Sequence, residues 1–176
     1  MANGSEALPR STVPSGALDS AAPSMEFHRL TPGLVLRAGP RDVSEEEIRD
    51  FALRYDPQPF HIDGEAAAAS RWGGLIASGW MTCAIAMELA VRYILPGSGS
   101  IGSPGIDELR WEHPVRPGDQ LFLAITVLES RVTSSGRTGI VRWRWELDNQ
   151  RKTRVLSLLA TSMFELSGVS PMTFRH

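Results

Sequence analysis

The segment from Trp80 to Leu95, WMTCAIAMELAVRYIL, decides the fold of this chain. Apolar residues fill nearly all of its positions, and only Thr82, Glu88 and Arg92 interrupt them. A helix that crosses a membrane needs about 20 apolar residues, so this segment is too short to span a bilayer. Because it is apolar around its whole circumference, we predict a helix buried in a protein core. Glu88 and Arg92 are spaced to pair at i, i+4 where that helix emerges.

The chain after Pro96 has the pattern of β-strands. Apolar side chains alternate with charged ones in two stretches, which predicts half-buried antiparallel strands, and two longer apolar runs lie beside them. The four predicted strands are 108–113, 120–132, 141–147 and 154–166. Short polar turns between the last three predict hairpins. One buried helix followed by these strands predicts an α+β fold in which the sheet wraps around the helix.

Two helices are predicted before the apolar segment. Ser44 and Glu47 have the spacing of a capping box, which starts a helix, and Pro57 ends it. Its apolar residues recur at i, i+3, i+4 and i+7, so one face is expected to pack inward. A second, short helix is predicted over 64–71, with Asp63 as its N-cap.

Length and charge limit the domain organisation and the partners. A chain of 176 residues is long enough for one domain with a core. We expect that domain over 25–168, with tails at 1–24 and 169–176 that have no periodic apolar pattern. Eighteen basic and 20 acidic residues give a net charge of −2, which argues against nucleic acid or a membrane surface as partner.

The lone cysteine, Cys83, leaves no thiol for an intrachain disulfide or for a thiolate metal cluster within one chain. The chain also lacks the pattern of a signal peptide. A cytoplasmic location is therefore expected.

A candidate acid/base pair lies in the segment 55–63, YDPQPFHID. Asp56 and His61 stand five positions apart, and two prolines restrict the segment between them. Fully extended, five residues would separate the two groups by roughly 15 Å, so the segment must curl if both are to hold one water or substrate atom. The structural alternative is that Asp56 ends a helix in a tight turn and His61 is a hydrogen-bonded core residue. Asp63 is interpreted as a helix cap.

The segment 73–80, GGLIASGW, leads directly into the apolar helix. A helix N-terminus offers unpaired amides and the positive end of the dipole, which stabilise a developing oxyanion. Gly79 lacks Cβ and would let a carbonyl group approach its amide closely. The alternative is a glycine-rich turn with Ser78 as N-cap, and the two interpretations can hold together.

Three strings resemble one family. YDPQPFHID, GGLIASGWMT and RWEHPVRPGDQL are similar, in order and spacing, to the MaoC-like dehydratases, which include the (R)-specific enoyl-CoA hydratases. The resemblance covers roughly residues 30–166. It implies the hot-dog fold, a long central helix wrapped by an antiparallel sheet, in agreement with the pattern above.

The resemblance also implies a site. Asp56 and His61 would hold the water that adds to, or leaves from, the α,β double bond of an acyl thioester. The Gly79 amide would bind the thioester oxygen, and Ser78 would be a second residue that binds the substrate there. The substrate would be an acyl-CoA or acyl-carrier thioester, with no metal and no cofactor. Hot-dog subunits of this family pair near the site, so a homodimer is expected.

Two other functions are compatible with the same fold. One is a hot-dog thioesterase, which would place its carboxylate on or near the central helix, where Glu88 is the only acid. The other is a non-catalytic acyl-CoA-binding protein. His113 is a further polar candidate, interpreted as a histidine at the end of a strand.

Overall fold

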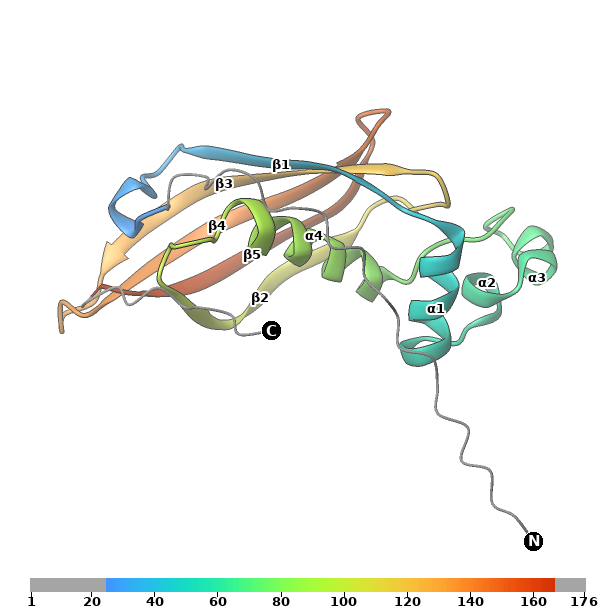
Figure 1. Ribbon diagram of the computed structural model, residues 1–176, viewed down its shortest axis with the longest axis horizontal. Coiled ribbons are helices and arrows are strands. Elements are labelled where there is room, and N and C mark those ends of the chain that lie inside the picture. Colours follow the sequence, from blue (N-terminus) through green and yellow to red (C-terminus); the bar gives the residue numbers. More distant parts are fainter. Residues whose placement is uncertain (1–24, 167–176) are drawn as a thin grey trace, which may run out of the picture.

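The computed structural model describes residues 25–166, so the predicted tails at 1–24 and 169–176 lie outside the described residues. Figure 1 shows the arrangement of its helices and strands. In chain order these are η1 (Phe27–Arg29), β1 (Val35–Asp42), α1 (Glu45–Tyr55), α2 (Pro59–Ile62), α3 (Gly64–Ala69), α4 (Gly79–Tyr93), β2 (Ser100–Trp111), β3 (Gln120–Val132), β4 (Thr138–Asn149) and β5 (Arg154–Glu165). None of the helices in the described range is long and apolar enough to cross a membrane.

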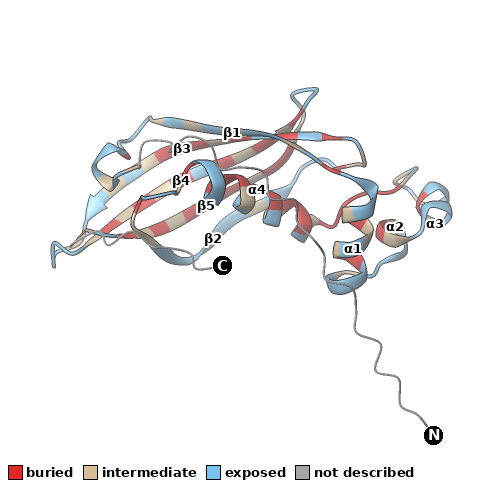
Figure 2. Cartoon of the chain, viewed as in Figure 1, coloured by how far each residue is buried: buried red, intermediate tan, exposed pale blue. Residues whose placement is uncertain are grey.

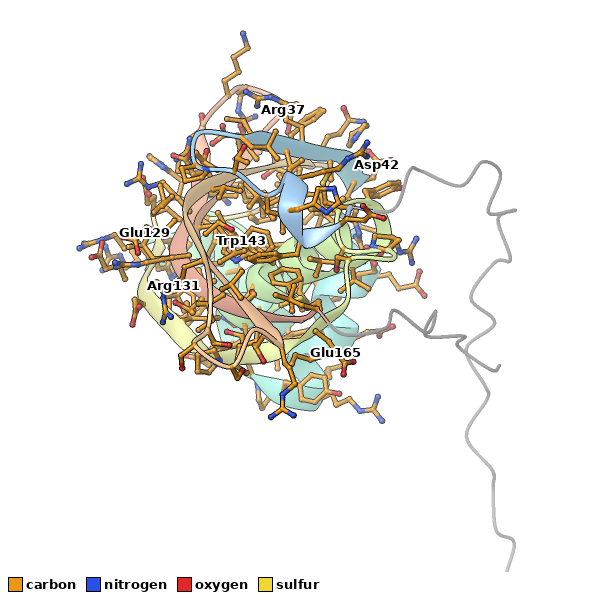
Figure 3. The ribbon with its side chains drawn as sticks, turned by 90° about the vertical axis from the view of Figure 1, so that its left-hand side faces the viewer. Arg37, Asp42, Glu129, Arg131, Trp143 and Glu165 are labelled. Carbon is orange, nitrogen blue, oxygen red and sulfur yellow. The ribbon has the colours of Figure 1, made fainter. Side chains whose placement is uncertain are left out.

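The strands form one antiparallel sheet in the order β1-β3-β4-β5-β2. The predicted hairpins between β3 and β4 and between β4 and β5 are confirmed. The sheet curls around α4, as the view along the molecule in Figure 3 shows. This is the α+β architecture with a wrapped central helix that the pattern predicted, and it is the hot-dog arrangement that the resemblance implied.

The core lies between α4 and the concave face of the sheet. Along β4 the residues Val141, Trp143, Trp145 and Leu147 are all buried and alternate with charged residues, as predicted. Figure 3 shows Trp143 inside the curve of the sheet and Glu129 and Arg131 outside it. The alternation follows from the pleat, which directs successive side chains to opposite faces.

The predicted burial of α4 in the core is confirmed for one side of the helix, and the other side is exposed in this single chain. Its buried residues are Met81, Thr82, Ile85, Ala86, Leu89 and Ala90. Trp80, Met87 and Val91 are 60%, 47% and 47% exposed, and Figure 2 shows both classes along the helix. The sheet packs against one face of α4 and leaves the opposite face uncovered. The predicted pair of Glu88 and Arg92 is present at 3.0 Å.

The two strands at the sheet edges differ from the prediction. Nearly all of β2 is exposed, so the half-burial predicted over 108–113 is wrong, because β2 lies at the edge of the sheet and little of the described chain packs over its faces. Strand β1 was missed because Gly39-Pro40 interrupts its pattern, and the register with β3 shifts there. A Cβ on Gly39 would lie 2.7 Å from the Leu121 carbonyl oxygen, and its φ of +113° also favours glycine.

The helices α1, α2 and α3 lie together at one end of the sheet, beside the start of α4 (Figure 1). The capping box of α1 is confirmed, since the Ser44 hydroxyl accepts from the Glu47 amide and the Glu47 carboxylate accepts from the Ser44 amide. Asp63 caps α3 as predicted, through the amides of Glu65 and Ala66. Helix α2, a single turn, was not predicted.

Candidate active site

Helix α2 brings the two halves of the predicted acid/base pair together. Asp56 follows the last residue of α1, and the chain turns at once into α2, which has Pro59 in its first turn. His61 lies on that turn, and its Nε2 atom is 3.3 Å from Oδ2 of Asp56. The curl that the spacing required is therefore present, and proline suits it because its fixed φ is that of a helix start.

The imidazole of His61 is held in one tautomer. The side chain is buried, and its Nδ1 atom lies 2.7 Å from the carbonyl oxygen of Ile76. Because a carbonyl oxygen can only accept a hydrogen bond, Nδ1 must carry the proton and donate it. In the neutral ring Nε2 then has a free lone pair, and it is this atom that faces Asp56.

The carboxylate of Asp56 accepts two further hydrogen bonds. Ser78 donates its hydroxyl to Oδ2 at 2.7 Å, and the Gln58 amide donates to Oδ1 at 2.7 Å. Partial burial alone would raise the pKa of Asp56, but the hydrogen bonds from Ser78 and Gln58 outweigh it and lower the pKa, and His61 adds to this effect when its Nε2 carries a proton. Asp56 is therefore a carboxylate at neutral pH.

Ser78 and Gly79 start α4 beside this pair. The Ser78 hydroxyl accepts from the Trp80 amide at 3.2 Å, so it caps the helix as predicted while it donates to Asp56. Gly79 is the first residue of the helix, where an amide has no acceptor within the helix itself. This amide lies at the positive end of the dipole of a 15-residue helix. The fold therefore brings an acid/base pair, a hydroxyl and an unpaired amide together at the start of α4, from two segments about 20 positions apart in the chain.

Two contacts of the site had no signal in the sequence. The acceptor for His61 is the backbone carbonyl of Ile76, and every residue type has a carbonyl. Trp111, at the end of β2, donates its indole N–H to the carbonyl oxygen of Gly79 at 2.9 Å. This contact joins residues 32 positions apart, and only the fold places them together.

The other candidates have different partners. Asp63 caps α3, and His113 Nδ1 lies 2.8 Å from the carbonyl oxygen of Arg154, which fits a histidine at the end of a strand. Glu88 is paired with Arg41 at 3.3 Å and with Arg92 at 3.0 Å.

Comparison with known proteins places the chain in a family. Residues 29–145 match the model of the MaoC like domain. The uncharacterized protein YdeM of Bacillus subtilis (strain 168) is 31% identical over 131 residues, which are 74% of this chain and 92% of that protein.

Two solved structures resemble the fold closely. The MaoC-like dehydratase from Rhodospirillum rubrum has a TM-score of 0.75 and 37% identity, over 81% of this chain and 98% of its own. The unliganded R-hydratase PhaJ1 from Pseudomonas aeruginosa has a TM-score of 0.65 and 25% identity, over 86% of this chain and 97% of its own. The chain therefore belongs to the MaoC-like dehydratase family.

Proposed function

We propose that the protein is an acyl-thioester hydratase/dehydratase, which adds water reversibly to a 2-enoyl-CoA and forms a 3-hydroxyacyl-CoA. The observation that carries the proposal is the 3.3 Å separation between His61 Nε2 and Asp56 Oδ2, beside the first amide of α4. The family includes a protein named as an R-hydratase and one named as a dehydratase, the two directions of this reaction.

The acid/base pair is suited to binding one water molecule. Two acceptors 3.3 Å apart allow a water oxygen to lie within hydrogen-bond distance of both, with one O–H directed at the Asp56 carboxylate and the other at His61 Nε2. The pair takes a proton from this water as its oxygen bonds to the β-carbon, and it returns a proton to the α-carbon. Dehydration follows the same steps in reverse. Such positioned proton transfer contributes about 10²–10⁴-fold to a rate. Because the two groups are coupled, the steps are assigned to the pair.

The Gly79 amide supplies the second requirement of the reaction. When the water oxygen attacks the β-carbon, negative charge moves to the thioester oxygen and an enolate forms. A fixed amide and the positive end of the α4 dipole stabilise that charge more in the transition state than in the substrate. The Ser78 hydroxyl fixes the start of α4 relative to the acid/base pair, because it caps α4 and also donates to Asp56.

The thioesterase alternative has less support. Its only acid on the central helix, Glu88, is paired with two arginines. Glu88 also lies nine residues beyond Gly79, which is about 13 Å along a helix at 1.5 Å per residue. A carboxylate so paired and so distant from the unpaired amide is poorly placed to attack a thioester bound there.

A non-catalytic acyl-CoA-binding protein also fits the fold less well. A protein that only binds would not need a carboxylate and an imidazole lone pair directed at one another. The hydrogen bonds that fix both groups, from Ile76, Ser78 and Gln58, have no purpose in binding an apolar acyl chain.

We further propose that the working unit is a homodimer acting on acyl-CoA or acyl-carrier thioesters. The exposed residues Trp80, Met87 and Val91 form one stripe along α4, and the unpaired edge strand β2 exposes Ile101 and Ile106. A second copy would cover the stripe and extend the sheet across β2. With one cysteine, the chain suits a reducing compartment, and we place the reaction in the cytoplasm.

The test is a direct absorbance assay of enoyl-CoA hydration over a series of acyl chain lengths. Asp56→Asn and His61→Ala should each lower kcat by about 10²-fold or more. His113→Ala is the matched control, because that imidazole is hydrogen-bonded to a backbone carbonyl outside the site.

Mass analysis of the product separates the alternatives. A 3-hydroxyacyl-CoA product supports the proposal, whereas free CoA without hydroxyacyl product would identify a thioesterase. Acyl-CoA binding without turnover would identify a binding protein. Unchanged hydration rates in both site variants would show that this mechanism is wrong.

A further inference from the structure

Trp111 packs tightly against Gly79 at the start of α4, a contact that no sequence pattern predicted. Its indole Nε1 donates to the Gly79 carbonyl oxygen at 2.9 Å. Its ring lies against the Cα of Gly79 so closely that a Cβ at position 79 would meet Cε2 at 2.5 Å and Cδ2 at 2.7 Å. Cβ atoms are not tolerated at such distances, so the ring already occupies the space of a side chain at position 79.

The indole is itself held in place. Trp80 contacts it edge to face, with ring centroids 5.4 Å apart and an interplanar angle of 78°. Such aromatic pairs have preferred geometries that resist rotation of either ring. Although Trp111 is 48% exposed, it is fixed by a hydrogen bond on one side and by an aromatic ring on another.

We propose that Trp111 is a positioning residue that fixes the first turn of α4 and thereby the direction of the Gly79 amide. The inference rests on the proposed function, in which that amide binds the thioester oxygen. It also gives a reason for glycine at position 79 that differs from substrate access: the residue must leave room for Trp111.

The first turn of a helix is held less firmly than its middle and gains from an outside contact. Its amides lack partners within the helix, and helix ends fray. Oxyanion stabilisation depends on a donor that is already aimed where the charge develops, and a misplacement of about 1 Å can lower a rate by about 10²-fold. A carbonyl held by Trp111 limits the rotation of the Gly79–Trp80 peptide and so steadies the turn that contains the Gly79 amide.

The first experiment compares Trp111→Phe with Trp145→Phe in the hydration assay. Phenylalanine at 111 keeps an aromatic ring but removes the N–H, so kcat should fall about 10-fold with little change in KM, because the lost alignment acts on charge that appears in the transition state. Trp145→Phe is the matched control, since it makes the same indole-to-phenyl change at a residue whose Nε1 has no hydrogen-bond partner among the described residues, and it should keep kcat within about 2-fold. Thermal unfolding and light scattering of each variant verify fold and oligomeric state.

The second experiment is a double-mutant cycle on the contact itself. Gly79→Ala should lower kcat by about 10²-fold because its Cβ displaces the indole or the helix start. Trp111→Ala removes the atoms that this Cβ would meet. The double variant Gly79→Ala with Trp111→Ala should therefore be as active as Trp111→Ala alone, which is a strongly non-additive result.

The outcomes are distinct. A wild-type kcat in Trp111→Phe, or additive losses in the cycle, would overturn the inference while the hydratase activity of the wild type still supports the proposed function. A wild-type protein without hydratase activity would overturn both. If Trp111→Phe is unfolded, the comparison of Gly79→Ala with the double variant still tests the proposal. The double variant should be more active than Gly79→Ala only when the Trp111 ring is what excludes the Cβ.

Discussion

The hydroxyl of Ser78 donates to Oδ2 of Asp56 at 2.7 Å, across 22 positions of the chain. The same oxygen accepts from the Trp80 amide and so caps α4. One side chain thus joins the beginning of the central helix to the carboxylate of the acid/base pair. Ser78 consequently couples the start of α4, which contains the Gly79 amide, to the carboxylate of Asp56.

Replacing Ser78 by alanine should remove both hydrogen bonds, and each loss has its own measurable effect. We expect the free energy of unfolding to fall by about 0.5–2 kcal/mol from the lost cap. The pKa of Asp56 should rise because one donor to its carboxylate is gone, and the acid limb of the kcat/KM profile should move to higher pH. Ser44→Ala, which removes the cap of α1, should lose similar stability without this pH shift. Equal pH profiles for the two variants would contradict the role of Ser78.

Gln58 should influence the same carboxylate from its other oxygen. Its amide donates to Asp56 Oδ1 at 2.7 Å, so Gln58→Leu should raise the pKa of Asp56, and the carboxylate form should be lost at higher pH than in the wild type. The measurement is kcat/KM against pH on the acid side. Gln120→Leu removes an equivalent bond, from Gln120 to Asp42 at 2.7 Å, away from the site and should leave the profile unchanged. No shift in Gln58→Leu would show that this bond does not tune Asp56.

Stability should depend on the titration of Glu47. A hydrogen bond from Arg41 lowers the pKa of Glu47, against an opposing effect of partial burial. Because the pKa is lower in the folded state, the stabilisation is present above the ordinary glutamate range and is lost as the pH falls through the folded pKa. Denaturant unfolding between pH 7 and pH 3 should show a flatter decline for Glu47→Gln than for the wild type. Glu46→Gln, an exposed acid of the same turn, should follow the wild type.

The exposed face of α4 should be a subunit interface. Val91→Glu places a charge on the apolar stripe, so the protein should remain folded but dissociate, with a loss of hydration activity. Light scattering gives the mass and circular dichroism the fold. Leu53→Glu, at a residue of α1 that is 62% exposed, is the control and should keep the wild-type mass. A wild type that is monomeric and fully active on dilution would contradict the dimer.

The local structure of this protein follows closely from its sequence. The capping box at Ser44, the Asp63 cap, the alternation along β4 and the pair of Glu88 and Arg92 each depend on residues a few positions apart. Interactions of that kind follow from helix and strand periodicity alone. The edge strand β1 was missed because Gly39 and Pro40 disrupt its pattern.

The sequence by itself determined the α+β class, the central helix and the segments that contain Asp56, His61, Ser78 and Gly79. Only the tertiary structure decided that His61 donates to the Ile76 carbonyl, that Ser78 reaches Asp56, and that Trp111 occupies the space beside Gly79. It also decided that α4 is half exposed. The physical reason is that these contacts join residues distant in the chain, some through backbone groups that every residue type has. Their geometry is fixed by the curl of the sheet and the turn of α2, which no local pattern encodes.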